Sequence, residues 1–357
     1  MTRVKVGLGA RSYQIVIGPG LLEQAGRLLK ETGLSGELVI ITNPVVQRLY
    51  GDRLKEALGK EGFEATILLV GDGEEHKSLA SAGRLYSELT ERHAERQTPV
   101  LALGGGVIGD LAGFVAATYL RGVSLVQIPT TLLAQVDSSI GGKVAVNHGR
   151  LKNRVGVFYQ PRLVISDTST LKTLPAGELA NGLAEVIKSA VIRDGDFFSF
   201  IEKNMGRIKA LDDAVLEQIV ARSARIKAEV VAQDETDLGL RNILNYGHTI
   251  GHAIETVSDF GMEHGQAIAA GMLAAARISN KLGHLDSAGV TRLSSVIEAA
   301  GLSPEIPKLD MTRVMRAIGH DKKVVAGRIR FVLPSEIGSV FITEEVSPSL
   351  IEQVLAG

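Results

Sequence analysis

The chain has 357 residues, of which 45% are hydrophobic and 22% are charged. This length favours two domains or one large domain, and the composition is that of an ordinary folded protein, which excludes disordered, collagenous and coiled-coil chains. The 39 basic and 40 acidic residues leave a formal charge of -1 at pH 7. We expect no nucleic-acid partner, because proteins that bind nucleic acids carry a basic excess.

The chain contains no cysteine, which excludes disulfides, thiolate metal ligands and a cysteine nucleophile. Its N-terminal segment lacks the apolar core of a signal peptide, and no later run is long and apolar enough to span a membrane. We therefore expect a cytoplasmic protein with no membrane partner. Any metal ion would be bound by histidine and carboxylate side chains.

Five short apolar runs predict strands, and helix-like segments separate most of them. The runs are residues 38–42, 66–70, 100–103, 124–128 and 163–166. Because they are continuously apolar, they suit a parallel sheet that helices cover on both faces. The first part of the chain is therefore predicted to be a doubly wound α/β domain.

After about residue 175 the composition shifts to Ala, Leu, Glu and Lys at helical spacing, as in residues 214–232 and 266–281. Pro175 and Gly177 mark this change. We predict an α/β domain at residues 1–175 and a mainly α-helical domain at residues 176–357. Within the second domain, residues 327–333 are predicted to form a strand.

A glycine-rich turn follows the third predicted strand. Gly104, Gly106 and Gly109 form the pattern G-x-G-x-x-G between a strand and a helix. Glycines there let the backbone approach a pyrophosphate, and the N–H groups of the helix N-terminus favour its charge. A tight strand-to-helix connection would look the same. The turn also differs from the usual dinucleotide motif, which follows a first strand and has an acidic residue about 20 positions later.

Two further loops follow predicted strands, where open α/β sheets bind ligands. Residues 71–77 are polar and glycine-rich, and Thr130 and Thr131 offer hydroxyls at a helix start. A solvated turn and an ordinary helix cap would have the same residues. The sequence of these loops alone does not decide between ligand binding and such local structure.

Histidine and carboxylate residues in the second half indicate a metal site. His248 and His252 are four apart, which places them on one face of a helix, and His264 starts a later apolar helix. Glu185 lies in an apolar helical segment, where an unpaired charge is costly. Two histidines and one carboxylate form a catalytic zinc pattern.

The same histidines and carboxylate are compatible with purely structural roles. Glu185 could pair with Lys188 on a solvated helix face, and the histidines could cap helices or lie in the core. A zinc peptidase is excluded, because Thr249 stands where the general-base Glu of that motif would be.

Several cations lie beside glycines or in apolar helices. A phosphorylated, acidic substrate would need such groups, because phosphate accepts charge-assisted hydrogen bonds from several donors. Each cation taken singly is better explained as a solvated surface charge, although Lys143 follows a small-residue stretch, 138–142, that a ligand could approach. The cations are Arg121, Lys143, Lys152, Lys188, Lys227, Arg241, Lys322 and Lys323.

Taken together, these residues resemble the 3-dehydroquinate synthase family of sugar phosphate cyclases. The most specific stretches are residues 104–117 (GGGVIGDLAGFVAA), 121–143 (RGVSLVQIPTTLLAQVDSSIGGK), 182–188 (GLAEVIK) and 241–255 (RNILNYGHTIGHAIE). Four such blocks in the family's order are more specific than any one. The resemblance implies an NAD-binding α/β domain, a helical metal-binding domain and an active site between them.

The resemblance also implies individual roles. Zinc, or cobalt as an alternative, would be bound by Glu185, His248 and His264. The residues near NAD would be Thr42, Asn43, Asp72, Gly73, Glu74, Glu75, His76, Lys77, Gly105, Gly106, Val107, Ile108, Gly109, Asp110, Thr130, Thr131, Lys143, Lys152, Thr170, Leu171, Lys172 and Thr173. The residues around the substrate would be Arg121, Asp137, Lys143, Lys152, Asn153, Lys188, Lys227, Arg241, Asn245, His252 and Lys322 or Lys323.

The family reaction would convert 3-deoxy-D-arabino-heptulosonate 7-phosphate, a phosphorylated sugar acid, into 3-dehydroquinate and phosphate. It proceeds by transient oxidation with NAD, phosphate elimination, reduction and aldol closure. His252, Lys143 and Asp237 would take catalytic roles, and Arg121 would reach a partner subunit's site in a homodimer. Two positions depart from the family pattern: Leu151 replaces a Gly, and Asp237 replaces a longer Glu.

Three other functions stay open from the sequence. A related cyclase would share the metal and NAD but close a different sugar phosphate. A metal-dependent polyol dehydrogenase would release NADH and need no phosphate-binding cations. A non-catalytic NAD-sensing module would leave Glu185 and the histidines idle. Release of phosphate from the substrate separates the cyclases from the other two.

Overall fold

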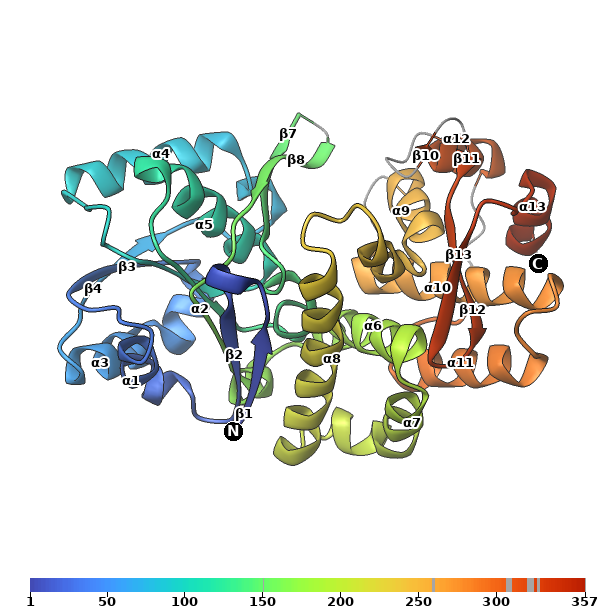
Figure 1. The fold of residues 1–357 in the computed structure, drawn as a ribbon, viewed down its shortest axis with the longest axis horizontal. Coiled ribbons are helices and arrows are strands. Elements are labelled where there is room, and N and C mark those ends of the chain that lie inside the picture. The colour runs from blue at the N-terminus through green and yellow to red at the C-terminus, as the bar shows by residue number, and fades with distance from the viewer. Residues whose placement is uncertain (150, 259–260, 306–309, 320–323, 326–327, 357) are drawn as a thin grey trace. The chain divides into compact units, whose positions relative to one another are not determined.

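The computed structural model describes residues 1–149, 151–258, 261–305, 310–319, 324–325 and 328–356. The chain divides into two units, Met1–Leu174 with Leu216–Thr236, and Pro175–Val215 with Asp237–Gly357 (Figure 1). The chain thus passes into the second unit at Pro175, and most of one later helix returns to the first. The expected division at residue 175 did not include this return.

A seven-stranded sheet forms the centre of the first unit, in the order β1-β2-β9-β6-β5-β3-β4. Neighbouring strands are parallel except for β1 and β2, which pair antiparallel. The strands are β1 (Thr2–Val6), β2 (Tyr13–Gly18), β3 (Glu37–Thr42), β4 (Glu64–Leu69), β5 (Val100–Gly104), β6 (Leu125–Pro129) and β9 (Leu163–Asp167). All five predicted strands are present.

The strand pair β1 and β2 was not predicted from the sequence. In β1 the buried residues Val4 and Val6 alternate with polar ones, because only one face of this strand is covered. The hairpin of β7 (Lys143–His148) and β8 (Leu151–Phe158) was also missed. Nearly every residue of β8 is exposed, so this strand gives no apolar signal.

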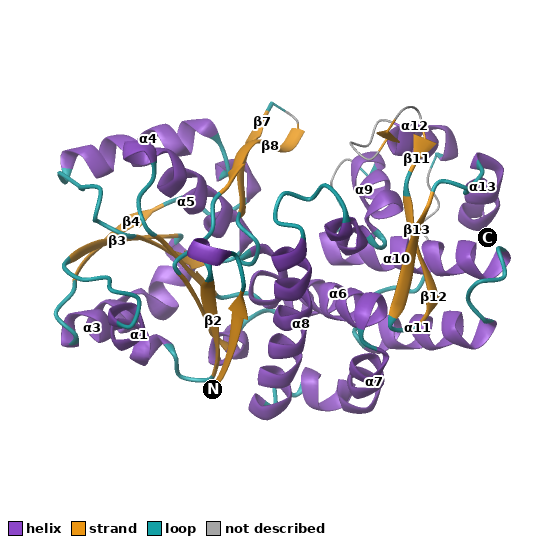
Figure 2. Ribbon diagram, viewed as in Figure 1, coloured by secondary structure: helices purple, strands orange, loops and turns teal. Residues whose placement is uncertain are grey.

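Helices cover both faces of the sheet (Figure 2). Alternate residues of β3 point to opposite sides: Ile40 packs with α1 (Ala25–Lys30) and α3 (Asp52–Lys60), whereas Ile41 packs with α4 (Leu79–Glu91) and α5 (Gly106–Thr118). The two layers confirm the predicted doubly wound α/β fold.

The second unit is mainly helical, as predicted, and contains short two-stranded sheets. Its helices include α6 (Ala176–Arg193), α7 (Gly195–Lys209), α9 (His248–Val257), α10 (His264–Lys281), α11 (Ser287–Ala299), α12 (Met311–Gly319) and α13 (Pro348–Ala356). Helix α8 (Asp213–Gln233) contributes to both units. The predicted strand at 327–333 is instead divided between β11 (Arg328–Ile329) and β12 (Phe331–Glu336) within its described residues; β11 pairs with β10 (Val324–Val325) and β12 with β13 (Ser339–Thr343).

Small residues set the spacing of α9 and α10. A Cβ on Gly271 would lie 2.0 Å from the Gly247 carbonyl oxygen, and a Cβ on Gly251 would lie 3.0 Å from the Ala267 carbonyl oxygen. Only glycine permits so close an approach of two backbones. Among the described helices, none has the length and apolar character needed to cross a membrane.

Candidate functional site

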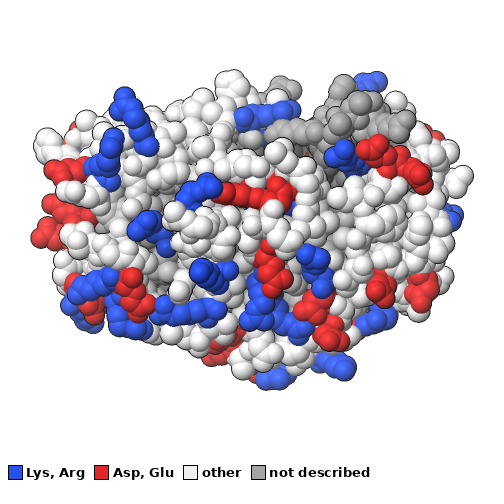
Figure 3. Space-filling model, viewed as in Figure 1, with Lys and Arg blue, Asp and Glu red and all other residues white. Residues whose placement is uncertain are grey.

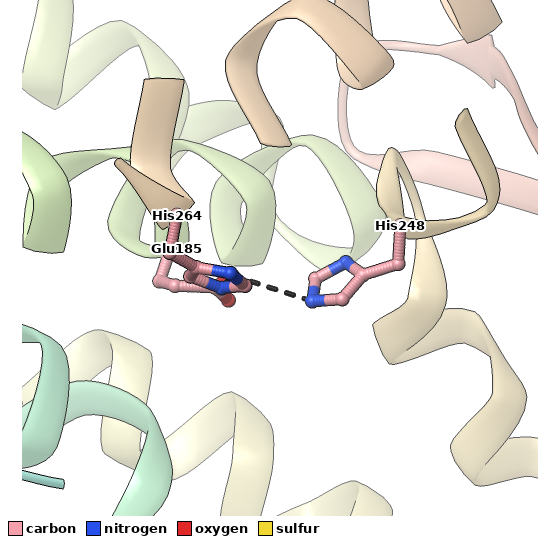
Figure 4. Close-up of side chains that lie close together, drawn as sticks. All are labelled: Glu185, His248 and His264. Carbon is pink, nitrogen blue, oxygen red and sulfur yellow. Dashed lines mark ion pairs between the residues drawn. The ribbon is translucent and has the colours of Figure 1, made fainter. Parts of the chain in front are cut away.

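Three helices of the second unit bring one carboxylate and two imidazoles together (Figure 4). Glu185 lies within α6, and His248 and His264 are the first residues of α9 and α10. Glu185 Oε1 lies 3.6 Å from His248 Nε2 and 3.5 Å from His264 Nε2. One ligand atom from each residue lies within 4.8 Å of the others, so a single ion can contact all three.

Local backbone features place these histidines. Gly247 precedes His248 with a φ of +78°, and a Cβ on Gly247 would lie 2.6 Å from Met272 Cγ. Gly265 follows His264, and its N–H donates to the Asn181 side chain on α6. A Cβ on Gly265 would lie 2.5 Å from the Asn181 carbonyl oxygen. Both helix starts therefore depend on glycines that allow contact with a neighbouring helix.

The second ring nitrogen of each histidine has a protein partner. His248 Nδ1 lies 3.1 Å from the Tyr246 carbonyl oxygen, and His264 Nδ1 lies 3.1 Å from Glu255 Oε1. A proton on Nδ1 leaves the Nε2 lone pair free, and metal-binding histidines commonly have such outer partners. The donor set and its orientation therefore fit a divalent ion of the zinc or cobalt type.

The charge environment of His264 also favours a cation. Burial lowers the pKa of its imidazole, but the interactions with Glu185 and Glu255 raise that pKa to about 9. The protonated imidazole is thus stabilised by the same carboxylates that would stabilise a bound cation. Because a metal ligand must lose this proton, metal binding and protonation at His264 compete.

Glu185 does pair with Lys188, but not on a solvated face. The two side chains contact each other directly, and they are only 1% and 3% exposed. The alternative of a pair on a solvated helix face is therefore wrong. Removing either partner would leave a buried charge uncompensated, which is far more costly than losing a surface pair.

His252 lies one helical turn beyond His248. Its ring centroid is 5.0 Å from that of His248 and 6.3 Å from that of His264. Arg241, which is 2% exposed, and Asn245 lie on the short helical segment Leu240–Asn245 before α9. Asp237 precedes this segment with a φ of +64°.

In the first unit, the candidate nucleotide residues gather at the carboxyl ends of neighbouring parallel strands. Thr42 and Asn43 follow β3, residues 71–77 follow β4, the glycine turn follows β5, and Thr130 and Thr131 follow β6. This is the edge at which open α/β sheets bind ligands. The predicted loops are thus brought together by the strand order.

The glycine turn combines tight packing with the start of α5, where the first backbone N–H groups of a helix have no partner within the helix. Added Cβ atoms would lie 3.1 Å from Thr131 Cγ2 at Gly105, 3.1 Å from Ser138 Oγ at Gly106, and 2.9 Å from Gln127 Oε1 at Gly109. Nearby, the fully buried Thr42 Oγ1 has no hydrogen-bond partner among the described residues. Backbone donors and an unsatisfied hydroxyl at one sheet edge fit a nucleotide.

Polar side chains link these loops. Lys77 Nζ lies 2.5 Å from Asp110 Oδ2, and Asn43 Nδ2 donates to Asp72 Oδ1 at 2.7 Å. Burial raises the pKa of the Asp110 carboxyl, and Lys77 opposes this shift. The Lys77 ammonium therefore helps to keep a half-buried carboxylate charged at the start of α5.

The candidate residues at 170–173 have mainly structural contacts. Thr170 and Leu171 are buried on the short helix Thr168–Thr173. The Tyr50 hydroxyl donates to the Thr170 carbonyl oxygen at 2.9 Å and also contacts Thr173 Oγ1. Lys172 is exposed.

The candidate substrate residues are divided between the units. Lys227 Nζ donates to Asp137 at 2.6 Å, and Lys143, Lys152 and Asn153 lie on the β7–β8 hairpin. Arg121 is exposed, with a φ of +68°. The second unit holds Lys188, Arg241, Asn245 and His252. Lys322 and Lys323 lie outside the described residues.

Two polar residues next to these sites were not singled out from the sequence. Glu255 lies at the end of one quoted stretch, and its spacing of seven from His248 places it on the same helix face. Asn147 lies near the end of β7, and no sequence motif marks it.

On the face shown in Figure 3, basic and acidic side chains are interspersed.

Comparison with known proteins gives consistent matches along the chain. Residues 67–181 match the family described as 3-dehydroquinate synthase N-terminal, and residues 182–324 match 3-dehydroquinate synthase C-terminal. The chain is 50% identical to 3-dehydroquinate synthase of Dehalococcoides mccartyi over 97% of this chain and 96% of the relative. It is 49% identical to 3-dehydroquinate synthase of Desulforamulus reducens over 100% of both chains.

Solved structures of related cyclases share the fold. 2-Epi-5-epi-valiolone synthase from Streptomyces hygroscopicus, with NAD+ and Zn2+ bound, gives a TM-score of 0.89 at 27% identity over 96% of both chains. 2-Deoxy-scyllo-inosose synthase, complexed with carbaglucose-6-phosphate, NAD+ and Co2+, gives a TM-score of 0.90 at 29% identity over 99% of both chains. The chain belongs to the 3-dehydroquinate synthase family.

Proposed function

We propose that this chain converts 3-deoxy-D-arabino-heptulosonate 7-phosphate into 3-dehydroquinate and phosphate, as an NAD- and metal-dependent lyase of the shikimate pathway. The convergence of Glu185, His248 and His264 carries this proposal, since it gives a family member the donor set that the reaction needs. Relatives named for this activity match the chain at about 50% identity, whereas the related cyclases with other substrates match at 27–29%.

Glu185, His248 and His264 would hold the metal ion, with zinc as the first candidate and cobalt as an alternative. When bound, the ion supplies Lewis acidity toward substrate hydroxyls, and NAD supplies reversible acceptance of a hydride. The Nδ1 contacts of His248 and His264 with Tyr246 and Glu255 would keep both Nε2 atoms oriented toward the ion.

The loops at the sheet edge would hold NAD. The N-terminus of α5 would receive the pyrophosphate through backbone N–H groups of the glycine turn. Thr42 Oγ1 has no hydrogen-bond partner within the part of the chain that the structure describes, and the carboxylates of Asp72 and Asp110 are acceptors of the kind that bind ribose hydroxyls. These groups orient the cofactor and exclude water from it.

Cations and neutral donors would hold the substrate phosphate and carboxylate. Lys152 and Asn153 on the hairpin, together with Arg241 and Asn245, offer the donors that a phosphorylated sugar acid requires. His252 would hold or transfer a proton at the phosphate end of the substrate. Lys143 and Asp237 are the further proton-handling candidates, and Lys227 fixes Asp137 by an ammonium–carboxylate contact.

The experiment that tests this function follows three products at once. Purified protein is mixed with the heptulosonate phosphate, NAD+ and zinc, and phosphate, 3-dehydroquinate and NADH are measured together. We expect phosphate and 3-dehydroquinate in equal amounts without net NADH. Turnover only with another sugar phosphate would show a sister cyclase, and accumulation of NADH without phosphate would show a dehydrogenase.

A cytoplasmic homodimer is part of the proposal. Arg121 supports it, because an exposed arginine on a turn with positive φ is accessible to a second copy. Light scattering measures the oligomeric state, and mixing two inactive variants tests the shared site. The two variants are Arg121→Ala and His248→Ala, and their subunits are allowed to exchange. If Arg121 completes the partner's site, each mixed dimer has one intact site. Because about half of the dimers are mixed, about one quarter of all sites regain activity.

A further inference from the structure

Asn147, near the end of β7, connects the loop that follows β4 to the adjoining strand β8. Its backbone N–H donates to the Lys77 carbonyl oxygen at 2.8 Å, and it forms a parallel bridge with Ser78. The end of β7 is thereby attached to the loop that follows β4. This loop carries the candidate nucleotide residues Glu74 and Lys77.

The Asn147 side chain makes three further hydrogen bonds, two as a donor and one as an acceptor. Its Nδ2 donates to Glu74 Oε1 at 2.8 Å and, at 3.5 Å, to the Glu74 backbone carbonyl oxygen, and its Oδ1 accepts from the Asn153 backbone N–H at 2.9 Å. One amide therefore uses both its donor and its acceptor to join a candidate nucleotide residue to a candidate substrate residue.

A second connection runs parallel to this one through Lys77. Lys77 is 5% exposed, and its Nζ donates to Asn153 Oδ1 and to Asp110 Oδ2, both at 2.5 Å. Asn153 itself has a φ of +54°, which is in the left-handed region. This conformation costs a non-glycine residue free energy, and contacts with the surrounding structure must offset that cost. Asn147 and Lys77 hold the backbone and side chain of this residue respectively.

We propose that Asn147 is a positioning residue that couples NAD binding to substrate binding. The inference rests on the proposed function. A nucleotide that orders Glu74, Lys77 and Asp110 also orders Asn153 through the Asn147 amide, so less free energy is then needed to order the hairpin around the substrate. By linkage, the substrate must tighten NAD binding by the same factor.

The test is a comparison of NAD+ affinities by calorimetry on the zinc-loaded protein. NAD+ is titrated with and without the phosphonate analogue of the substrate, in which a methylene replaces the bridging oxygen and prevents phosphate loss. In the wild type we expect the analogue to tighten NAD+ binding at least about 5-fold, the lower end of ordinary coupling. In Asn147→Ala we expect this factor to fall below about 2-fold, with faster hydrogen exchange at the Asn153 amide.

Asn204→Ala is the matched control, because Asn204 also donates to a backbone carbonyl but lies on α7. We expect it to keep the wild-type factor. An unchanged factor in Asn147→Ala, an equal loss in Asn204→Ala, or no coupling in the wild type would each overturn the inference.

A reversal of donor and acceptor gives a second, independent test. Asn147→Asp keeps an acceptor for the Asn153 amide but places two carboxylates, those of residues 147 and 74, against each other. Adding Glu74→Gln restores the pair in the reverse direction, because the amide at 74 can then donate to the carboxylate at 147. We expect the coupling factor of the double variant to lie within about 2-fold of that of Glu74→Gln alone. The effects of substitutions at two residues in contact are not additive, so the second substitution can compensate for the first. Failure of this rescue while both variants fold and bind NAD+ contradicts the inference.

The two levels of the proposal fail in different ways. A wild-type protein that makes 3-dehydroquinate but shows no dependence of coupling on residue 147 overturns only the role of Asn147. A wild-type protein that neither binds NAD+ nor releases phosphate overturns the proposed function, and the role of Asn147 with it.

Discussion

The candidate metal site and the candidate nucleotide site are built in different ways. The metal ligands come from three helices of the second unit, and close packing through Gly247, Gly265 and Gly271 fixes where those helices begin and how near they lie. The nucleotide residues lie on loops of the first unit. There, long-range hydrogen bonds such as those of Lys77 and Asn147 hold the loops together.

This difference has a functional meaning. A metal site needs ligand atoms placed within tenths of an ångström, which packed helices provide. A site that must admit and release NAD needs segments that can be ordered by their ligand, and loops joined by a few polar contacts meet this need. We therefore expect substitutions at the metal site to abolish function, and substitutions in the loops to change affinities by graded amounts.

The largest effect is expected for His248→Ala. Loss of one of three ligands should remove the ion after dialysis and lower the rate of phosphate release by a factor on the order of 1,000, since Lewis-acid stabilisation contributes several kcal/mol. Bound zinc and phosphate release are measured on the same sample. His284→Ala is the control, because His284 is exposed in the same unit. Normal turnover by zinc-free His248→Ala would contradict the assignment.

A smaller effect is expected for Gly109→Val in the glycine turn. The added side chain meets Gln127 Oε1, which a Cβ alone would approach to 2.9 Å, so either the Gln127 side chain must leave its hydrogen bond to the Gly109 carbonyl oxygen or the start of α5 must shift. We expect NAD+ affinity to fall on the order of 100-fold, or about 2.7 kcal/mol, with zinc content unchanged. Gly59→Val is the control, because nothing lies within 4 Å of a Cβ there. Unchanged NAD+ affinity would show that the turn serves packing alone.

The same contrast explains what the sequence could predict. The five buried parallel strands were predicted because each is continuously apolar, and His248 and His252 because their spacing matches the helical period. The half-covered strand β1 and the exposed strand β8 carry no such signal, whereas β2 has a short buried apolar run, Ile15 to Ile17, and was missed. The sequence placed Glu185 in an apolar segment but left open whether it pairs with Lys188 in a core or on a solvated face, because a spacing of three residues is the same in both.

Long-range polar contacts were the least predictable feature. Asn147 and Glu74 are 73 residues apart, and an asparagine near the end of a strand is ordinary in composition. Only the meeting of β7 with the loop after β4 gives this residue a role. Glu255 had a weak signal in its helical spacing from His248, but its partner, His264, starts a different helix.

Glu255→Gln would sharpen the comparison at the metal site. The amide can still accept from His264 Nδ1 but has no charge, so the imidazole becomes a weaker ligand. We expect zinc affinity, measured by chelator competition, to fall about 10-fold, the lower end for outer partners of metal ligands. Glu298→Gln, on the neighbouring helix α11, is the control. His252, Glu255 and His264 also have one ligand atom each within 4.8 Å of the others, so binding of two zinc ions per wild-type chain would instead indicate that Glu255 is itself a ligand.

The smallest effect is expected where the chain departs from the family pattern. Leu151 begins β8 and is 54% exposed, so its side chain has little packing to lose. Leu151→Gly would lower the free energy of unfolding by about 0.5–1 kcal/mol, because glycine in a strand loses more backbone entropy on folding. We expect the KM for substrate to rise less than about 3-fold, with kcat unchanged. The hydrogen bonds of Asn147 and Lys77 would still hold Asn153. A rise above about 10-fold would show that the residue before Lys152, rather than these contacts, sets the hairpin conformation.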